Sequence, residues 1–133
     1  MTDKIIDDPH LVPIEGTFLW WLDQDFDVLD DILGPIKARK YFITDVGSVP
    51  RIAWNIIPPI GPATLGYVVH DWLYATQTFP RAEADACLLR LMAQFGVGYV
   101  SRYTVYWALR AFGGKAWDDD AKKGPQFYKP VLI

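Results

Sequence analysis

Val69-His70-Asp71-Trp72-Leu73-Tyr74 is the stretch of this chain that does most to decide its fold and its chemistry. It places an imidazole, a carboxylate and, one helical turn later, a phenol inside an otherwise apolar segment. Burying an ionisable group costs free energy unless the group has a partner, a metal or a task. The stretch belongs to a helical pattern from about Ala63 to Ala75, on which His70 and Tyr74 share a face because they are four residues apart.

Two more helices are expected after this one. Pro80 stands where a helix can begin, and the alanines and leucines that follow it favour a helix that stops near Gly96. A third helix is expected over Tyr99–Phe112, with the glycine pair Gly113-Gly114 as its C-terminal cap. The last residues, 118–133, are expected to form an exposed tail whose apolar side chains could dock on a neighbour.

The part of the chain that precedes these helices has the pattern of β structure. Aromatic and β-branched residues alternate with turn formers, and short strands are expected over Thr17–Leu22, Phe26–Leu29 and Ile36–Ile43. Turns are expected near residues 23–25 and 33–35. The predicted fold class is therefore α+β, with a small N-terminal antiparallel sheet followed by a three-helix half.

Length and composition fit one folded domain rather than a disordered chain. The 133 residues are 51% hydrophobic and 15% aromatic, with six tryptophans. A chain of this length can bury roughly two thirds of the surface that it exposes when unfolded. We predict a single domain over residues 1–133, made of an N-terminal arm (1–16), a β-rich part (17–49), a helical part (50–117) and a tail (118–133).

Charge and cysteine content argue against several classes of protein. The net charge of −3 disfavours electrostatic capture of nucleic acid, and Lys37-Ala38-Arg39-Lys40 is only a small basic patch, so we predict no nucleic-acid partner. Cys87 is the only cysteine, so no intrachain disulfide can form. The N-terminus lacks the features of a signal peptide, and no stretch supplies the roughly 20 apolar residues that cross a bilayer. We therefore predict neither a signal peptide nor a transmembrane segment.

A carboxylate on the next predicted helix stands at a spacing that can reach His70. Asp85 follows His70 by 15 residues, so an antiparallel pairing of the two helices could bring its carboxylate to the imidazole. Asp85 would then orient the ring as the acid of a triad does, and His70 could take a proton from water at neutral pH. The alternative is a structural His70–Asp85 pair that joins two helices without catalysing anything.

The adjacent Asp71 points about 100° around the helix from His70 and can have a different role. One interpretation makes Asp71 a ligand of a cation such as calcium, with Asp45 as a second metal carboxylate. The other makes Asp71 a cap of the Thr44–Ser48 loop through backbone N–H groups, and Asp45 a cap of the turn or helix that begins near Pro50. Zinc is disfavoured, because two histidines and one cysteine cannot build a closed structural site without carboxylates.

At these residues the chain resembles a domain family of unknown function that is common in tailed phages and prophages. The family's pattern is a Phe-x-Thr-Asp-x-x-Ser-x-Pro-Arg segment, a His-Asp-x-Leu-Tyr helix, an Arg-x-x-Ala-Asp segment and a closing Arg-x-Phe-Gly-x-x-x-Trp. The resemblance covers roughly Thr17 to Trp117 and implies a phage protein, located in the virion or the host cytoplasm, with phage structural proteins or host envelope components as partners. The matching residues are Phe42, Thr44, Asp45, Ser48, Pro50, Arg51, His70, Asp71, Leu73, Tyr74, Arg81, Ala84, Asp85, Arg110, Phe112, Gly113 and Trp117.

A more distant likeness is to the phospholipase A2 group, in which a His-Asp-x-x-Tyr motif lies on a helix. There the histidine activates water, the adjacent aspartate binds calcium, and a later aspartate on an antiparallel helix holds the histidine. Carried over by motif, these roles fall on His70, Asp71 and Asp85, with Tyr74 in support. The chain differs from that group because it lacks the glycine- and cysteine-rich calcium loop and the disulfides, and offers only the Thr44–Ser48 segment as a substitute.

Two functions of different classes are consistent with these features. The first is a phage-encoded hydrolase that acts on an ester or amide of the host envelope, with lipid as the first substrate and peptidoglycan as the second. Its predicted catalytic residues are His70, Asp85 and Tyr74, and its predicted metal ligands are Asp71 and Asp45. The alternative is a non-enzymatic virion or tail-assembly protein that binds other subunits through an aromatic surface, with the histidine and the aspartates in structural roles.

Overall fold

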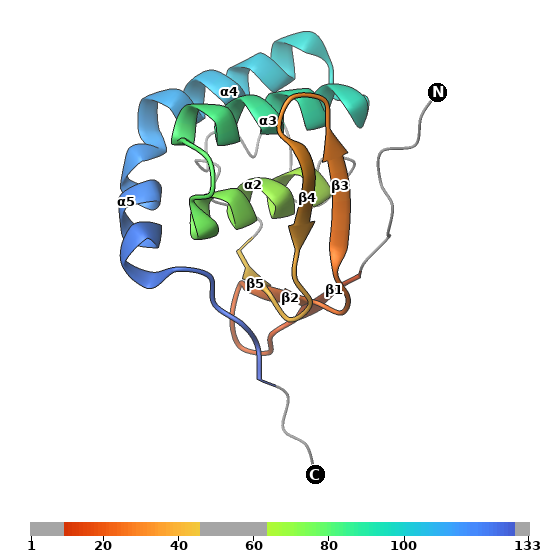
Figure 1. Ribbon diagram of the computed structural model, residues 1–133, viewed down its shortest axis with the longest axis vertical. Coiled ribbons are helices and arrows are strands. Elements are labelled where there is room, and N and C mark those ends of the chain that lie inside the picture. Colours follow the sequence, from red (N-terminus) through yellow and green to blue (C-terminus); the bar gives the residue numbers. More distant parts are fainter. Residues whose placement is uncertain (1–9, 46–63, 130–133) are drawn as a thin grey trace.

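The computed structural model describes residues 10–45 and 64–129, which form five short strands followed by four helices (Figure 1). The predicted α+β class, with antiparallel β structure before the helices, is confirmed. The three predicted helices are present, and the described residues form a fourth helix after them. The elements are β1 (Leu11–Pro13), β2 (Trp20–Leu22), β3 (Phe26–Asp30), β4 (Gly34–Ala38), β5 (Ile43–Thr44), α2 (Thr64–Thr76), α3 (Arg81–Gln94), α4 (Tyr99–Phe112) and α5 (Gly114–Lys123).

The strands form two small antiparallel sheets in place of the single sheet that was expected. β1, β2 and β5 make a three-stranded sheet in that order, and β3 and β4 make a hairpin. The predicted strand Ile36–Ile43 is split because the chain turns between β4 and β5: the Phe42 N–H donates to the Arg39 carbonyl, and Tyr41 adopts a φ of 71°. This left-handed residue directs the chain out of the hairpin, so that β5 pairs with β2.

Two more boundaries at the N-terminal end require correction. Of the predicted strand Thr17–Leu22, only its last three residues pair, as β2. Thr17 lies in a turn, in which its hydroxyl donates to the Ile14 carbonyl and accepts from the Leu19 N–H. The stretch predicted as an N-terminal arm contains β1, which pairs with β2. Strand pairing therefore begins earlier in the chain than the alternation of residues predicted.

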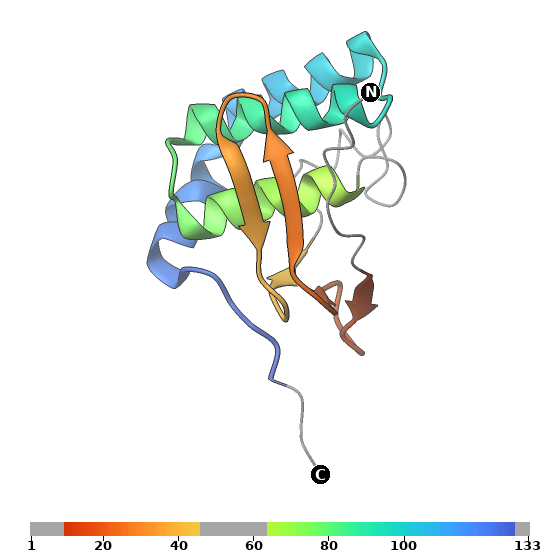
Figure 2. The same cartoon turned by 45° about the vertical axis from the view of Figure 1, so that its right-hand side comes forward.

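Helix α2 occupies the centre of the molecule. It packs against α3, α5 and the β3–β4 hairpin, and eight of its 13 residues are buried. In Figure 1 α3 runs antiparallel to α2, and Figure 2 shows the hairpin lying across both helices. A helix enclosed on several sides must be apolar on most of its faces. The ionisable side chains of α2 therefore have to find partners inside the protein.

The first residues of the predicted exposed tail, 118–123, belong to the helix α5, which begins at Gly114. Gly113 does not adopt the left-handed conformation of a glycine cap but has a φ of −75°, so the chain continues from α4 into α5. Lys115 and Asp119 pair at 2.9 Å one turn apart, and Lys122-Lys123 lie in the last turn, near the negative end of the helix dipole. The helix ends at Gly124, where φ is 66°.

The last described residues return to the three-stranded sheet. The Ile43 N–H donates to the Gln126 carbonyl, and the Tyr128 N–H donates to the Tyr41 carbonyl. The Tyr128 ring also stacks on Trp21, with the ring centroids 5.0 Å apart. This part of the chain, expected to be free to dock on a neighbour, instead packs on the protein itself.

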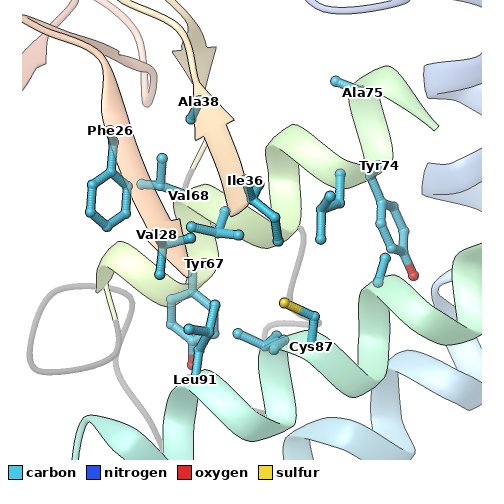
Figure 3. Close-up of a cluster of buried hydrophobic side chains, with 14 of the residues drawn as sticks. Phe26, Val28, Ile36, Ala38, Tyr67, Val68, Tyr74, Ala75, Cys87 and Leu91 are labelled. Carbon is cyan, nitrogen blue, oxygen red and sulfur yellow. The ribbon is translucent and has the colours of Figure 1, made fainter. Parts of the chain in front are cut away.

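The hydrophobic core fills the space between the β3–β4 hairpin, α2 and α3 (Figure 3). Figure 3 shows Val28 and Ile36 of the hairpin facing Val68 of α2. α2 and α3 are in contact at Gly66, where an added Cβ would lie at an ordinary contact distance of 3.4 Å from Cδ1 of Leu88. None of the helices within residues 64–129 is long and apolar enough to cross a membrane.

Candidate functional site: a buried carboxylate shared by histidine, tyrosine and arginine

The antiparallel helices α2 and α3 bring His70 and Asp85 together. Nε2 of His70 lies 2.8 Å from Oδ1 of Asp85, and the two side chains are 2% and 0% exposed. The predicted contact between these residues is therefore present. A hydrogen bond that is shielded from water to this degree is strong, and it holds the imidazole in one orientation.

Asp85 also binds three side chains other than His70. Its Oδ1 accepts a hydrogen bond from the Tyr74 hydroxyl at 2.7 Å, its Oδ2 accepts one from Nη1 of Arg110 at 2.8 Å, and Nη1 of Arg81 lies 3.6 Å from Oδ2. Burial raises the pKa of Asp85, but the hydrogen bond and charge of His70 and the hydrogen bonds of Tyr74 and Arg110 outweigh it and hold the pKa below its ordinary value. Asp85 is therefore an anion at neutral pH.

Tyr74 is held in place by the same carboxylate and by rings on either side. Burial, followed by the hydrogen bond to Asp85, raises the pKa of Tyr74 well above its ordinary value, so its hydroxyl stays protonated and remains a donor. Its ring centroid lies 4.3 Å from that of His70 and 5.1 Å from that of Trp117. Tyr74 thus fixes the position of Asp85 and packs against the imidazole.

The sequence analysis gave Arg81 and Arg110 no role in the site. Two features could have indicated one: Arg81 stands four residues before Asp85, which puts both on one face of α3, and Arg110 belongs to the closing motif of the family pattern. Arg81 also donates to the carbonyls of Leu109 and Arg110 at 2.9 and 3.3 Å, which satisfies acceptors at the C-terminal end of α4. The network therefore ties α4 to α2 and α3.

A glycine is required where α4 approaches this network. A Cβ added at Gly113 would lie 2.6 Å from the Leu109 carbonyl oxygen and 2.8 Å from the Tyr74 hydroxyl, both closer than real contacts allow. A side chain at this position would push Tyr74 away from Asp85. The glycine of the closing motif is thus explained by close packing and not by a left-handed backbone.

Asp71 lies on another face of α2 and contacts β5 instead of α3. The Thr44 hydroxyl donates to Oδ2 of Asp71 at 2.6 Å. Burial and then the charge of Asp45 raise the pKa of Asp71 to about 8, against the opposing effect of hydrogen bonds from the Thr44 hydroxyl and the Asp45 backbone N–H. These contacts are of the kind expected for a carboxylate that caps the start of the Thr44–Ser48 loop.

A cavity of about 330 Å³ lies on this side of α2. Burial, and then the charges of Asp45 and Asp119, raise the pKa of Asp120 against the opposing charge of Lys123. The wall of the cavity combines three carboxylates with apolar side chains. Asp71 is the carboxylate that α2 contributes to this wall, whereas His70, its neighbour in the sequence, does not line the cavity. Its lining residues are Leu19, Phe42, Ile43, Asp45, Asp71, Ala75, Asp120, Lys123, Gly124 and Gln126.

The described residues do not complete the predicted calcium site. Within residues 10–45 and 64–129, no three histidine, cysteine, aspartate or glutamate side chains are grouped so that they could hold a metal ion. Calcium takes about six to eight oxygen ligands, and Asp71 and Asp45 offer only part of such a set. The predicted caps at Ser48 and near Pro50 lie outside the described residues.

The chain is thus a small α+β protein in which three helices converge on one buried carboxylate. The family model described as a protein of unknown function (DUF1353) matches residues 20–109, and the chain belongs to this family. The match includes Asp45, His70, Asp71, Tyr74 and Asp85. No curated protein and no solved structure matches the chain.

Proposed function

We propose that this protein is a hydrolase in which His70 is the general base and Asp85 orients it. The observation that carries the proposal is the 2.8 Å contact between Nε2 of His70 and Oδ1 of Asp85, reinforced by the Tyr74 hydroxyl on the same oxygen. An imidazole held through one nitrogen by a carboxylate is the arrangement that positions a general base in hydrolytic enzymes. Arg110 fixes the second oxygen of Asp85, so the carboxylate cannot rotate away.

The geometry leaves the second nitrogen of His70 for the reaction. When the Nε2 N–H of His70 donates a hydrogen bond to Asp85, Nδ1 carries the free lone pair, and none of the hydrogen bonds among residues 10–45 and 64–129 uses it. The pKa of Asp85 is held low, so this carboxylate stays charged and does not take the proton from the ring. Because His70 is only 2% exposed, the base serves a water-sized reactant.

The reaction is then a hydrolysis by activated water. A water proton passes to Nδ1 of His70 while the water oxygen bonds to the carbonyl carbon of the ester or amide. When the tetrahedral intermediate collapses, the bond to the leaving oxygen or nitrogen breaks, and the proton moves from His70 to that atom. No step requires a group outside this chain, the substrate and water.

The cavity beside Asp71 supports a host-envelope lipid as the first substrate and peptidoglycan as the second. Leu19, Phe42 and Ile43 provide an apolar wall for an acyl chain. Lys123 offers a cationic donor to polar parts of a substrate. The proposal includes a phage or prophage origin, for which such an enzyme would act on the envelope of the host.

The decisive experiment compares substitutions of the only two histidines in the chain. Purified His70→Gln is expected to keep its fold by circular dichroism but to lose about 10²-fold or more in the rate of fatty-acid release from phosphatidylethanolamine vesicles, or of product release from peptidoglycan. His10→Gln is the matched control, because His10 is an exposed residue whose partner is Asp23. Equal rates in His70→Gln and wild type, or no turnover by wild type on either substrate, would contradict the proposal.

Calcium remains part of the proposal as a stabilising ligand of Asp71 and Asp45. The charge of Asp45 raises the pKa of Asp71, and a cation held by both carboxylates would remove this repulsion. Wild type should then gain thermal stability in millimolar calcium, and Asp71→Asn should not. An equal change of melting temperature in the two proteins would leave Asp71 with the capping role alone.

A further inference from the structure

The segment that follows α5 forms one wall of the cavity beside Asp71. Residues 124–129, which we call the strap, cross from the end of α5 to β5 on the outside of the molecule (Figure 1). Gly124 and Gln126 of the strap line the cavity, and the other lining residues belong to α2, α5 and the neighbourhood of β2 and β5. One wall of the cavity is therefore made by a segment that lies outside the helices and strands of the fold.

Few polar contacts attach the strap to the sheet. The Ile43 N–H donates to the Gln126 carbonyl at 2.9 Å, and the Tyr128 N–H donates to the Tyr41 carbonyl at 2.8 Å. The side-chain amide of Gln126 donates to two carbonyls, one in the last turn of α5 and one in the strap itself. Among the residues that the structure describes, no ion pair joins the strap to another element. Two backbone hydrogen bonds are thus its only polar attachment to the sheet in this part of the chain.

Ring contacts supply the rest of the attachment. The Tyr128 ring stacks on Trp21, with the centroids 5.0 Å apart and the planes 7° apart. Phe127 meets the rings of Phe42 and Trp72 edge-on, and it is 42% exposed. None of residues 124–129 is buried, and none belongs to the hydrophobic core or packs against it. Segments with few buried apolar contacts open locally more easily than the core does, so the strap can leave the sheet while the core stays folded.

A glycine stands where the strap begins. Gly124 has a φ of 66° and a ψ of −174°, a combination that is open essentially only to glycine. A Cβ added at this position would meet nothing within 4 Å, so the backbone conformation and not close packing requires the glycine. Lids commonly turn on a few residues at the end of an element, which absorb the change in φ and ψ. Rotation about the backbone bonds of Gly124 would move the strap and leave α5 in place.

We propose that the strap is a lid, which detaches from the sheet to admit an aliphatic chain to the cavity and then closes over this chain. Leu19, Phe42 and Ile43 supply an apolar wall for such a ligand. Detachment transfers the Ile43 N–H and the Tyr41 carbonyl to water, which takes over their hydrogen bonds, so neither group is left unsatisfied. The choice of ligand rests on the proposed function, which places an acyl chain in this cavity, whereas the motion of the lid is independent of it.

The alternative is a fixed wall that opens only when the sheet itself unfolds. A hydrogen bond in the same part of the sheet distinguishes the two cases, because the Leu22 N–H donates to the Phe42 carbonyl at 3.1 Å and Leu22 is 0% exposed. With a lid, the amides of Ile43 and Tyr128 exchange with solvent through a local opening, and the amide of Leu22 exchanges only through a larger unfolding. With a fixed wall, all three amides exchange through the same event.

Native-state hydrogen exchange of the full chain, followed by NMR, tests the lid. After correction for intrinsic rates, the amides of Ile43 and Tyr128 are expected to exchange about tenfold faster than that of Leu22 or more, at rates that low urea concentrations leave unchanged. Tyr128→Ala removes the ring stack and should speed exchange at Ile43 by about tenfold, but not at Leu22. Tyr99→Ala is the matched control and should change neither rate, because Tyr99 is an exposed tyrosine that contacts a neighbouring ring on α4.

The probe for the ligand is 1-octanol, which combines an aliphatic chain with a hydroxyl that can donate to the carboxylates of the cavity. Octanol should shift the NMR signals of Leu19 and Ile43, which line the cavity. At about ten times the Kd obtained from these shifts, it should slow exchange at Ile43 and Tyr128 about tenfold, because it stabilises the closed state. Tyr128→Ala should weaken octanol binding, and Tyr99→Ala should leave it unchanged.

The opposite results overturn the proposal. Equal exchange at Ile43, Tyr128 and Leu22, or an equal acceleration of all three in Tyr128→Ala, would make the strap a fixed part of the sheet. Octanol that shifts neither Leu19 nor Ile43, or that leaves the exchange rates unchanged, would reject a lid that closes over an aliphatic chain. None of these measurements uses hydrolytic turnover. A chain that shows the lid but no turnover would contradict the proposed function alone, and turnover without local opening would contradict the lid alone.

Discussion

Replacing Asp71 by asparagine should change how the stability of the protein depends on pH. Asparagine keeps an oxygen for the Thr44 hydroxyl and the Asp45 N–H but removes the charge. In the folded protein the pKa of Asp71 is raised from 3.8 to about 8, so the native state binds this proton more tightly than the unfolded state does. The resulting stabilisation is complete below pH 4 and is lost progressively as the pH rises to about 8.

The size of the effect can be estimated from this shift. Each pKa unit corresponds to about 1.4 kcal/mol, so a rise from 3.8 to about 8 sets an upper limit of about 6 kcal/mol. Part of the shift comes from the charge of Asp45, which titrates together with Asp71. We therefore expect Asp71 to lower the free energy of unfolding of wild type by about 2–4 kcal/mol between pH 5 and pH 8.5. The pKa of Asp120 is also raised, so Asp120 makes both proteins less stable as the pH rises. The stability of the variant therefore still falls with pH, but less steeply than that of wild type.

The assay is urea unfolding in calcium-free buffer at several pH values from 5 to 9. Wild type is expected to lose stability across this range, and the Asp71→Asn curve should be much flatter and should lie above that of wild type near pH 8.5. Asp119→Asn is the control. Lys115 lowers the pKa of this exposed carboxylate, so Asp119 affects the pH dependence of stability only at lower pH than the range of the assay. Parallel curves for wild type and Asp71→Asn would refute the argument that the folded protein raises the pKa of Asp71.

Three further substitutions test the packing of the helices on one another and on the β3–β4 hairpin. Gly113→Ala should destabilise the protein by about 1–3 kcal/mol in urea unfolding, because its Cβ would lie 2.6 Å from a carbonyl oxygen. Gly114→Ala is the control and should be tolerated, because its Cβ meets nothing within 4 Å. Similar losses in the two variants would count against the close contact at Gly113. Tyr67→Phe should raise the melting temperature or leave it unchanged, since the buried Tyr67 hydroxyl has no hydrogen-bond partner in the described part of the chain. A large decrease in the melting temperature would show that the hydroxyl does have a partner. Arg90→Met should lower the free energy of unfolding by about 3–5 kcal/mol, because it leaves the buried Asp30 carboxylate without its ion pair. A decrease below about 1 kcal/mol would mean that this ion pair contributes little to stability.

Local sequence patterns determined the helices and the first contact of the site. The predicted helix Tyr99–Phe112 agrees with α4 at both ends, although Gly113, predicted as its glycine cap, has a φ of −75° and leads directly into α5. The His70–Asp85 contact was predictable from local spacing. Two consecutive helices with a short connection pack antiparallel, so a separation of 15 residues is enough to place the two side chains opposite each other.

Only the tertiary structure decided the features that depend on distant parts of the chain. The aspartates of α5 suggested an exposed tail, but the helix is stabilised where Trp117 packs on Tyr74 and its carbonyl accepts from Gln77, contacts that no local pattern contains.

Arg110 reaches Asp85 across 25 residues of sequence, and its role emerges only when α4 packs on α3. The raised pKa of Asp71 likewise results from burial beside Asp45, which follows β5 and lies far from α2 in the sequence. The amino-acid sequence therefore determined which residues were available for chemistry. Their partners, charges and access to solvent were decided by tertiary packing, because burial and electrostatic interaction depend on distance in space and not on spacing along the chain.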